Sequence, residues 1–231
     1  MYEGQRVCAI IPAAGSGTRM GGKAKHLLCV KGKPVIAYSL ELFQRLPIID
    51  AIMVAASAQT ISETRNIAGK YKIAKLIDVM LGGEHRQDSV WNCLKSLNEK
   101  QFGLVLVHDA ARPFVDEDIV RRVVEAASQH GGAIAAVRAK DTIKLAEDGF
   151  VAETLNRDKV WQVQTPQGFK SELLRRAFFN AQASGFIGTD EASIVEKLDE
   201  KVRIVESSYE NIKITTPQDL EIAELMADAK M

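Results

Sequence analysis

The chain has 231 residues, and its 30 Lys and Arg residues balance its 30 Asp and Glu residues, so the formal net charge is zero. This balance excludes the broad positive field that attracts nucleic acid or an anionic membrane, so anions must be bound by a few positioned side chains. Hydrophobic residues make up 46% of the chain, which is usual for a globular protein. No apolar run reaches the roughly 20 residues of a membrane span. We expect one domain over residues 1–231, with neither nucleic acid nor a membrane as a partner.

The cysteines and the N-terminal segment indicate a cytoplasmic protein. Cys8, Cys29 and Cys93 are odd in number, scattered and without CxxC spacing, which argues against a disulfide framework or a zinc site. The opening stretch MYEGQRVCAIIPAAG mixes acidic with basic residues, and its apolar part is too short for a signal peptide.

Strands alternate with helices along the first 137 residues. Short apolar runs bounded by turn residues predict strands at 7–11, 51–55, 74–79, 104–107 and 133–137. Helical spacing of apolar residues predicts helices at 34–45, 57–71, 89–97 and 116–130. This alternation favours an α/β fold, a Rossmann-like mostly parallel sheet flanked by helices. Segments that follow the strands then meet at one rim, namely 13–25, 82–89 and 108–112.

The pattern changes after residue 137. The stretch DTIKLAEDGFVAETL predicts two short strands around Glu147-Asp148-Gly149. This hairpin is too short to form a core, so we expect a small protruding arm at about 138–158 that packs on another subunit. A helix at 172–184, a strand near 202–205 and a final helix capped by Thr216 follow. The polar stretches around 156–158, 164–167 and 188–191 suggest turns.

The glycine-rich segment AAGSGTRMGGKAK resembles a phosphate-binding loop, because clustered backbone amides can hold phosphate oxygens. The dinucleotide fingerprint GxGxxG is not met, and the Walker A pattern fails because Ala24 stands where a hydroxyl residue would hold magnesium. What remains is a glycine turn followed by Arg19, Lys23 and Lys25, which could neutralise a triphosphate. The alternative is a surface loop with solvated lysines.

Three further clusters have both a functional and a structural interpretation. Asp109 follows a buried strand and could bind Mg²⁺, with Arg112 contacting phosphate or hydroxyls, although both could serve the turn alone. The Gly82–Ser89 segment could cap a helix or contact a nucleobase edge. Lys213 lies in a β-like run, where an exposed lysine is ordinary.

Together, the motifs PAAGSGTRMG…K, GGEHRQDSV, VLVHDAARP, DTIK, NRD, QTPQ, TDEAS and NIKIT occur in the order of a known family. The chain resembles the 2-C-methyl-D-erythritol 4-phosphate cytidylyltransferase family, of the nucleotide-diphospho-sugar transferase type, from about residue 7 to 225. The resemblance implies that the acceptor phosphate attacks the α-phosphorus of CTP in line and releases pyrophosphate, with Mg²⁺ as cofactor. It also implies a homodimer formed through the arm.

The resemblance also implies a role for each matching residue. It gives cytidine contacts to Ala13, Ala14, Gly15, Gly83, Glu84 and Ser89. It gives triphosphate binding and catalysis to Gly17, Arg19, Lys25 and Lys213. Metal binding is implied for Asp109, and acceptor binding for Asp109, Arg112, Thr165 and Thr189, with Thr142 and Arg157 reaching the acceptor phosphate from the partner subunit. The loop departs from the family pattern at His26, where Gln is usual, and carries the additional cation Lys23.

Two other functions fit parts of the same pattern. A ribitol-5-phosphate cytidylyltransferase would share the glycine loop and a polyol phosphate acceptor. A non-catalytic nucleotide-binding protein could use the same scaffold, but the presence of Arg19, Lys25 and Asp109 argues against it.

Overall fold

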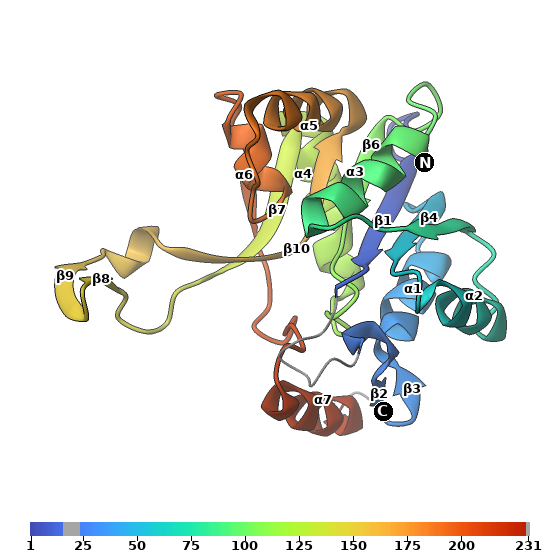
Figure 1. Ribbon diagram of the computed structural model, residues 1–231, viewed down its shortest axis with the longest axis horizontal. Helices are drawn as coiled ribbons and strands as arrows, with labels where there is room; N and C mark the ends of the chain where they lie inside the picture. The colour runs from blue at the N-terminus through green and yellow to red at the C-terminus, as the bar shows by residue number, and fades with distance from the viewer. Residues whose placement is uncertain (16–23, 230–231) are drawn as a thin grey trace.

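The computed structural model describes residues 1–15 and 24–229. Its centre is a seven-stranded sheet in the order β11-β7-β10-β6-β1-β4-β5 (Figure 1). The strands of this sheet are β1 (Val7–Ala13), β4 (Ala51–Ala56), β5 (Leu76–Leu81), β6 (Leu104–Val107), β7 (Gly132–Arg138), β10 (Trp161–Lys170) and β11 (Arg203–Glu206). Two small hairpins pair β2 (Cys29–Val30) with β3 (Lys33–Pro34) and β8 (Lys144–Glu147) with β9 (Phe150–Thr154).

Helices connect most of these strands. They are α1 (Val35–Arg45), α2 (Ile61–Lys70), α3 (Arg86–Ser96), α4 (Glu117–His130), α5 (Ser171–Ser184), α6 (Glu191–Glu196) and α7 (Pro217–Ala229), with short 3-10 turns at Lys25–Leu27 and Arg157–Lys159. Within residues 1–15 and 24–229, no helix combines the length and apolarity needed to cross a membrane.

The sheet is mostly parallel, which confirms the fold class predicted from the sequence. β1 pairs in parallel with β4 and β6, β4 with β5, and β11 with β7. Only β10 is reversed, because it pairs antiparallel with both β6 and β7. The carboxyl ends of the parallel strands therefore share one edge of the sheet, where ligand sites of such folds lie.

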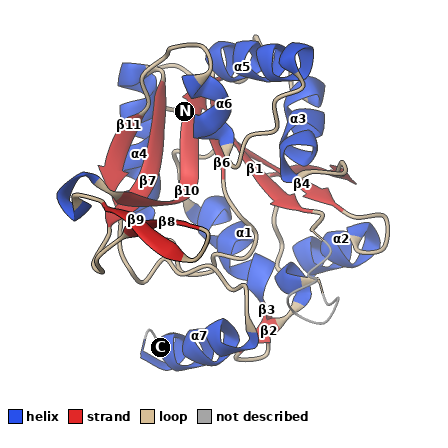
Figure 2. Ribbon diagram, turned by 60° about the vertical axis from the view of Figure 1, so that its left-hand side comes forward, coloured by secondary structure: helices blue, strands red, loops and turns tan. Residues whose placement is uncertain are grey.

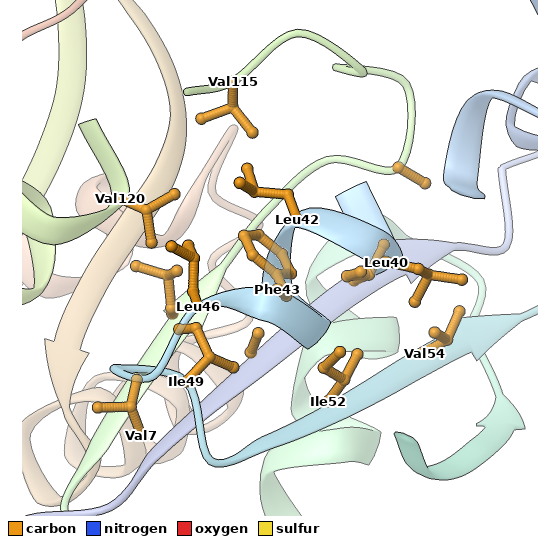
Figure 3. Packing of buried hydrophobic residues seen from close by; sticks show 14 of the residues in the cluster. Val7, Leu40, Leu42, Phe43, Leu46, Ile49, Ile52, Val54, Val115 and Val120 are labelled. Atoms are coloured by element: carbon orange, nitrogen blue, oxygen red, sulfur yellow. The ribbon is translucent and has the colours of Figure 1, made fainter. Parts of the chain in front are cut away.

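Helices cover both faces of the sheet (Figure 2). Successive residues of a strand point to opposite faces, so β1 sends Ala9 and Ile11 into one core cluster and Ile10 into the other. α1, α2 and α4 pack on the first face, and α3, α5 and α6 pack on the second. Figure 3 shows Phe43 of α1 within the first cluster, close to Leu42 and Leu46.

The interpretation of residues 164–167 as a turn was wrong, because they lie within the extended segment 161–170. The segment forms β10 in the interior of the sheet, although a proline, which lacks an amide donor, is rarely found there. The pairing of β10 with β7 is interrupted between Val163 and Gln167, so Pro166 sits in an irregular stretch of the ladder. There the Asn211 side chain donates a hydrogen bond of 2.8 Å to the Thr165 carbonyl.

Local capping explains two further differences from the sequence prediction. α3 begins at Arg86, three residues before the predicted start, because the Asp88 carboxylate accepts a hydrogen bond from the His85 amide. The polar stretch expected to be a turn at 188–191 leads into α6, whose first turn is capped by Asp190. The cap predicted at Thr216 for the last helix is present, since its hydroxyl accepts a hydrogen bond from the Asp219 amide at 3.3 Å, and the Asp219 carboxylate accepts one from the Thr216 amide at 2.8 Å.

β8 and β9 form the predicted hairpin and project away from the sheet (Figure 1). Asp148 and Gly149 form its two-residue turn, and both have positive φ angles, at 48° and 84°. A type I′ turn needs this conformation, which Asp-Gly provides at low cost. Every residue of both strands is exposed, so the described chain supplies no core for the arm.

Candidate active site

A cavity lies at the carboxyl edge of the sheet and collects residues from all three segments that were predicted to share a rim. Ala13 ends β1, and Ala14 and Gly15 follow it. Gly83, Glu84 and Ser89 follow β5, and Asp109 follows β6. Lys25 and Lys213 complete the set of predicted residues that line it. Gly17, Arg19 and Lys23, also predicted for this loop, lie outside the described residues.

Glycines allow two of these segments to touch. A Cβ atom on Gly82 would lie 2.4 Å from the Ala14 Cβ and 2.8 Å from the Ser89 Oγ. A Cβ on Gly83 would lie 2.2 Å from the Cβ of Asp88. Any larger residue would force the loops apart, so close backbone approach explains the paired glycines.

Ser89 serves the loop structure as well as lining the cavity. Its hydroxyl accepts a hydrogen bond from the Gly83 amide at 3.1 Å and donates one to the His85 carbonyl at 3.2 Å. Because a hydroxyl has one proton and two lone pairs, one lone pair is left for a ligand. Ser89 therefore ties the loop to α3, while the helix cap expected in this motif is made by Asp88, whose carboxylate accepts a hydrogen bond from the His85 amide. Toward a bound base, Ser89 can only accept a hydrogen bond.

Asp109 is the electrostatic centre of the site. Its carboxylate is almost buried and contacts Arg86 Nε at 2.9 Å and Lys213 Nζ at 2.6 Å, with Arg112 Nε at 4.0 Å. Burial alone would raise the pKa of Asp109, but Arg86 and then Lys213 hold it well below its ordinary value. The carboxylate is thus ionised throughout the physiological range.

Arg86 was not predicted as a site residue. Besides contacting Asp109, its Nη1 lies 2.7 Å and 2.9 Å from the two carboxylate oxygens of Glu191, which is 1% exposed. Burial alone would lower the pKa of Arg86, but Glu191 and Asp109 raise it above its ordinary value. Burial raises the pKa of Glu191, and Arg86 opposes this shift. The sequence signal was the position of Arg86 inside GGEHRQDSV, which gave no indication of its partners.

Lys213 is not part of a strand, contrary to its predicted β-like setting. The segment that carries it has no regular secondary structure and is held by a hydrogen bond from the Ile214 amide to the Ala111 carbonyl. This hydrogen bond brings Lys213 to the end of β6, where its ammonium group contacts Asp109. The ordinary interpretation of an exposed strand lysine is therefore wrong.

A second, neighbouring cavity contains the predicted acceptor residues Arg112, Thr165 and Thr189. It shares Arg86, Asp109 and Lys213 with the first cavity, so these three side chains form the wall between the two. Gln164 and Gln167 of β10 also line it. The reversed strand thus supplies Thr165, which was predicted for the acceptor site, together with Gln164 and Gln167, which were not.

A buried hydrogen-bond chain fixes Thr165. His108 Nε2 lies 3.0 Å from the Arg112 carbonyl, which can only accept, so Nε2 carries the proton and Nδ1 is an acceptor. The Thr165 hydroxyl therefore donates to Nδ1 at 3.1 Å and accepts from the Asp109 amide at 3.0 Å. Burial lowers the pKa of His108 to about 4, which keeps the ring neutral at pH 7. Thr165 positions the backbone of Asp109 and has one lone pair left for a substrate hydroxyl.

Thr142 and Arg157 lie apart from both cavities. They belong to the arm region, and Arg157 Nη1 donates a hydrogen bond to the Lys140 carbonyl at 3.2 Å. The single chain does not bring these two residues to the other predicted acceptor residues. Their implied role requires a second subunit.

The donor set agrees with a magnesium ion that arrives with a phosphate ligand. Mg²⁺ typically takes one or two carboxylates and completes its shell with phosphate oxygens and water. Asp109 and Glu84 are carboxylates that line the first cavity. Among the described residues, no cluster of three His, Cys, Asp or Glu side chains could hold a metal alone.

A mostly parallel sheet, a glycine-rich segment after its first strand and clustered cations at its carboxyl edge define an α/β nucleotide-binding enzyme. The 2-C-methyl-D-erythritol 4-phosphate cytidylyltransferase family matches residues 7–228. This chain belongs to that family of nucleotidyltransferases, which confirms the family and the cytidylyltransferase class predicted from the sequence.

Individual relatives agree over nearly the whole chain. The 2-C-methyl-D-erythritol 4-phosphate cytidylyltransferase of Clostridium acetobutylicum is 45% identical over 222 residues, covering 95% of this chain and 96% of the relative. That of Geobacter metallireducens is 42% identical over 229 residues, covering 97% and 99%. The crystal structure of 4-diphosphocytidyl-2C-methyl-D-erythritol synthase from Anaerococcus prevotii has a TM-score of 0.87 at 34% identity, covering 98% of this chain and 100% of that one.

His26 yields a pH-dependent prediction. Burial lowers its pKa from 6.5 to about 4, so the unfolded chain binds a proton below pH 6.5 that folded His26 does not. The stability that neutral His26 provides is complete above pH 6.5 and is lost as the pH falls toward 4, by at most about 3 kcal/mol. We expect His26→Gln to reduce the loss of unfolding free energy between pH 7.5 and pH 4.5, measured by urea denaturation. Equal losses in the two proteins would contradict this account.

Proposed function

We propose that this enzyme transfers the cytidylyl group of CTP to 2-C-methyl-D-erythritol 4-phosphate and releases pyrophosphate, as a step of non-mevalonate isoprenoid biosynthesis. The observation that carries the proposal is the pair of adjoining cavities with Asp109, Arg86 and Lys213 between them. One cavity adjoins the glycine-rich segment and the other contains polar side chains suited to a polyol. We also propose that the protein is cytoplasmic, which is supported by the free, buried thiols of Cys8 and Cys93.

In this proposal, CTP occupies the first cavity. Ala13, Ala14 and Gly15 approach the nucleotide through their backbone, and Gly83, Glu84 and Ser89 contact the cytidine. The close contact between Gly82 and Ala14 supports this assignment, because it joins the two loops into one wall. Gly17 and Arg19 are assigned to the triphosphate on their sequence positions alone.

The acceptor binds in the second cavity, where Thr165 and Thr189 would contact its hydroxyl groups. Arg112 would add a charged contact, and its buried Nε has no hydrogen-bond partner within the described residues. An unsatisfied buried donor of this kind is costly and favours a ligand that completes it. The acceptor phosphate would then face the nucleotide across Asp109 and Lys213.

The reaction needs charge neutralisation more than proton transfer. An oxygen of the acceptor phosphate forms a bond to the α-phosphorus of CTP, and the bond to the bridging oxygen of pyrophosphate breaks in line. The nucleophile is already an anion, so no strong base is required. The protein must overcome repulsion between two anions, and Arg19, Lys25 and Lys213 would do so. Mg²⁺ held by Asp109 and phosphate oxygens would neutralise further charge on the triphosphate.

A direct assay distinguishes this function from its nearest alternative. We expect Mg²⁺-dependent pyrophosphate release from CTP with 2-C-methyl-D-erythritol 4-phosphate, and a kcat/KM at least about tenfold lower with ribitol 5-phosphate, the scale for mismatched hydroxyls in a polar pocket. Coupled phosphate detection after pyrophosphatase measures both. A preference for ribitol 5-phosphate would overturn the acceptor, and no turnover of either would favour a binding protein.

Lys25 gives a second test of the site. It lines the nucleotide cavity from the 3-10 turn Lys25–Leu27, and its proposed role is to stabilise charge on the triphosphate. We expect Lys25→Ala to lower kcat by at least about 10²-fold, the scale for losing one preorganised charge contact. Lys95→Ala, which removes an exposed lysine from α3, is the matched control and should keep the wild-type rate. A nearly normal rate for Lys25→Ala would refute its role.

We also propose that two copies pair through the arm, so that Thr142 and Arg157 reach the acceptor phosphate of the partner subunit. Support comes from the arm itself, in which Leu145, Phe150 and Val151 are exposed to 48%, 78% and 64%. Apolar side chains on an isolated hairpin are expected to be covered by another surface. Arg157 lines neither cavity of its own chain, which also favours a contribution from a second copy.

Mixed dimers test this arrangement. Arg157→Ala and Lys25→Ala subunits should each be nearly inactive alone, but co-refolded in equal amounts they should recover about one quarter of wild-type activity. Half of the dimers are mixed, and in each of these one of two sites has both residues intact. If each arm served its own chain, mixing would recover nothing. Size-exclusion chromatography of each variant checks that dimers still form.

A further inference from the structure

Arg86 joins two helices through two buried carboxylates. It is the first residue of α3, and Glu191 is the first residue of α6. Its Nη1 contacts both oxygens of Glu191, while its Nε contacts Asp109 at the end of β6. Gln87 strengthens the same junction, because its side chain accepts a hydrogen bond from the Gly188 amide at 2.8 Å. Asp109 and Glu191 therefore hold the Arg86 guanidinium from two sides.

The two cations that contact Asp109 differ in their surroundings. Arg86 has 28% of its side chain exposed and a second carboxylate partner. Lys213 has 39% of its side chain exposed, and within residues 1–15 and 24–229 its only ion pair is with Asp109. Lys213 also lines both cavities, so its ammonium can turn toward a ligand in either. Arg86 cannot turn without leaving Glu191 buried and unpaired, which is strongly unfavourable.

The charges around Asp109 also indicate that Arg86 stays in place while Lys213 can move. Arg86, Arg112 and Lys213 carry three positive charges, and Asp109 and Glu191 carry two negative charges. If Lys213 moves from Asp109 to a phosphate, two positive and two negative charges remain, and Asp109 keeps its contact with Arg86. Without Arg86, the departure of Lys213 would leave the Asp109 carboxylate with Arg112, 4.0 Å away, as its only cationic side chain within residues 1–15 and 24–229, besides the Mg²⁺ that it would hold.

We infer that Arg86 is a positioning residue that keeps Asp109 paired and in place, so that Lys213 is free to transfer to the α-phosphate of the nucleotide. The inference rests on the proposed function of the site. Arg86 need not touch the substrate, because it acts through Asp109 and Lys213. Glu191 is its anchor, and fixes the guanidinium to the N-terminus of α6.

Two variants separate positioning from stability. Arg86→Gln leaves Glu191 unpaired, so its Tm should fall by more than about 5 °C. Arg86→Gln combined with Glu191→Gln removes both charges, so most of the Tm should return. In both proteins we expect kcat to fall about 10²-fold while KM for CTP changes less than about threefold, since the loss appears in the transition state. Arg175→Gln, which removes a structural arginine that binds the Leu94 and Leu97 carbonyls, should lower Tm without lowering kcat.

The double variant also tests for a purely structural role. If it regained wild-type kcat, Arg86 would be only a structural tie between α3 and α6. If the wild-type protein itself fails to turn over CTP with methylerythritol phosphate, the proposed function fails instead.

Discussion

The ionised Asp109 carboxylate is the constraint on which the rest of the site depends. A negative charge in a buried position requires compensation, and three cations from three different segments supply it. α3 contributes Arg86, the turn after β6 contributes Arg112, and the irregular segment before α7 contributes Lys213. Because one carboxylate gathers them, elements far apart in the chain meet at one point between two cavities.

The architecture around this point follows from ordinary α/β packing. Parallel strands place their following loops at one edge, and close packing at Gly82 and Gly83 presses the second loop against the first. The reversed strand β10 then adds residues that a purely parallel sheet would not present there. Thr165 is the clearest example, since its hydroxyl holds the Asp109 amide while His108 holds the hydroxyl.

Much of this could be predicted from the sequence, because strand and helix periodicity and the Asp148-Gly149 turn are local signals. The segments that form the rim could also be located from local signals, because each directly follows an apolar run. β10 was missed because Pro166 argues against an interior strand, and only the tertiary context of an interrupted ladder and Asn211 accommodates it. Arg86 and Glu191 were missed for a similar reason: they are 105 residues apart, and no short motif records their contact.

The neutral overall charge has a consequence for how substrates arrive and products leave. Arg86, Arg112 and Lys213 sit in the walls of the cavities beside the carboxylates of Asp109 and Glu191, so these five side chains together carry a net charge of only +1. At physiological ionic strength, screening reduces the field of this charge beyond about 8 Å. The small net charge of this cluster gives little long-range attraction to the two anionic substrates, and it likewise does little to retain pyrophosphate after the transfer.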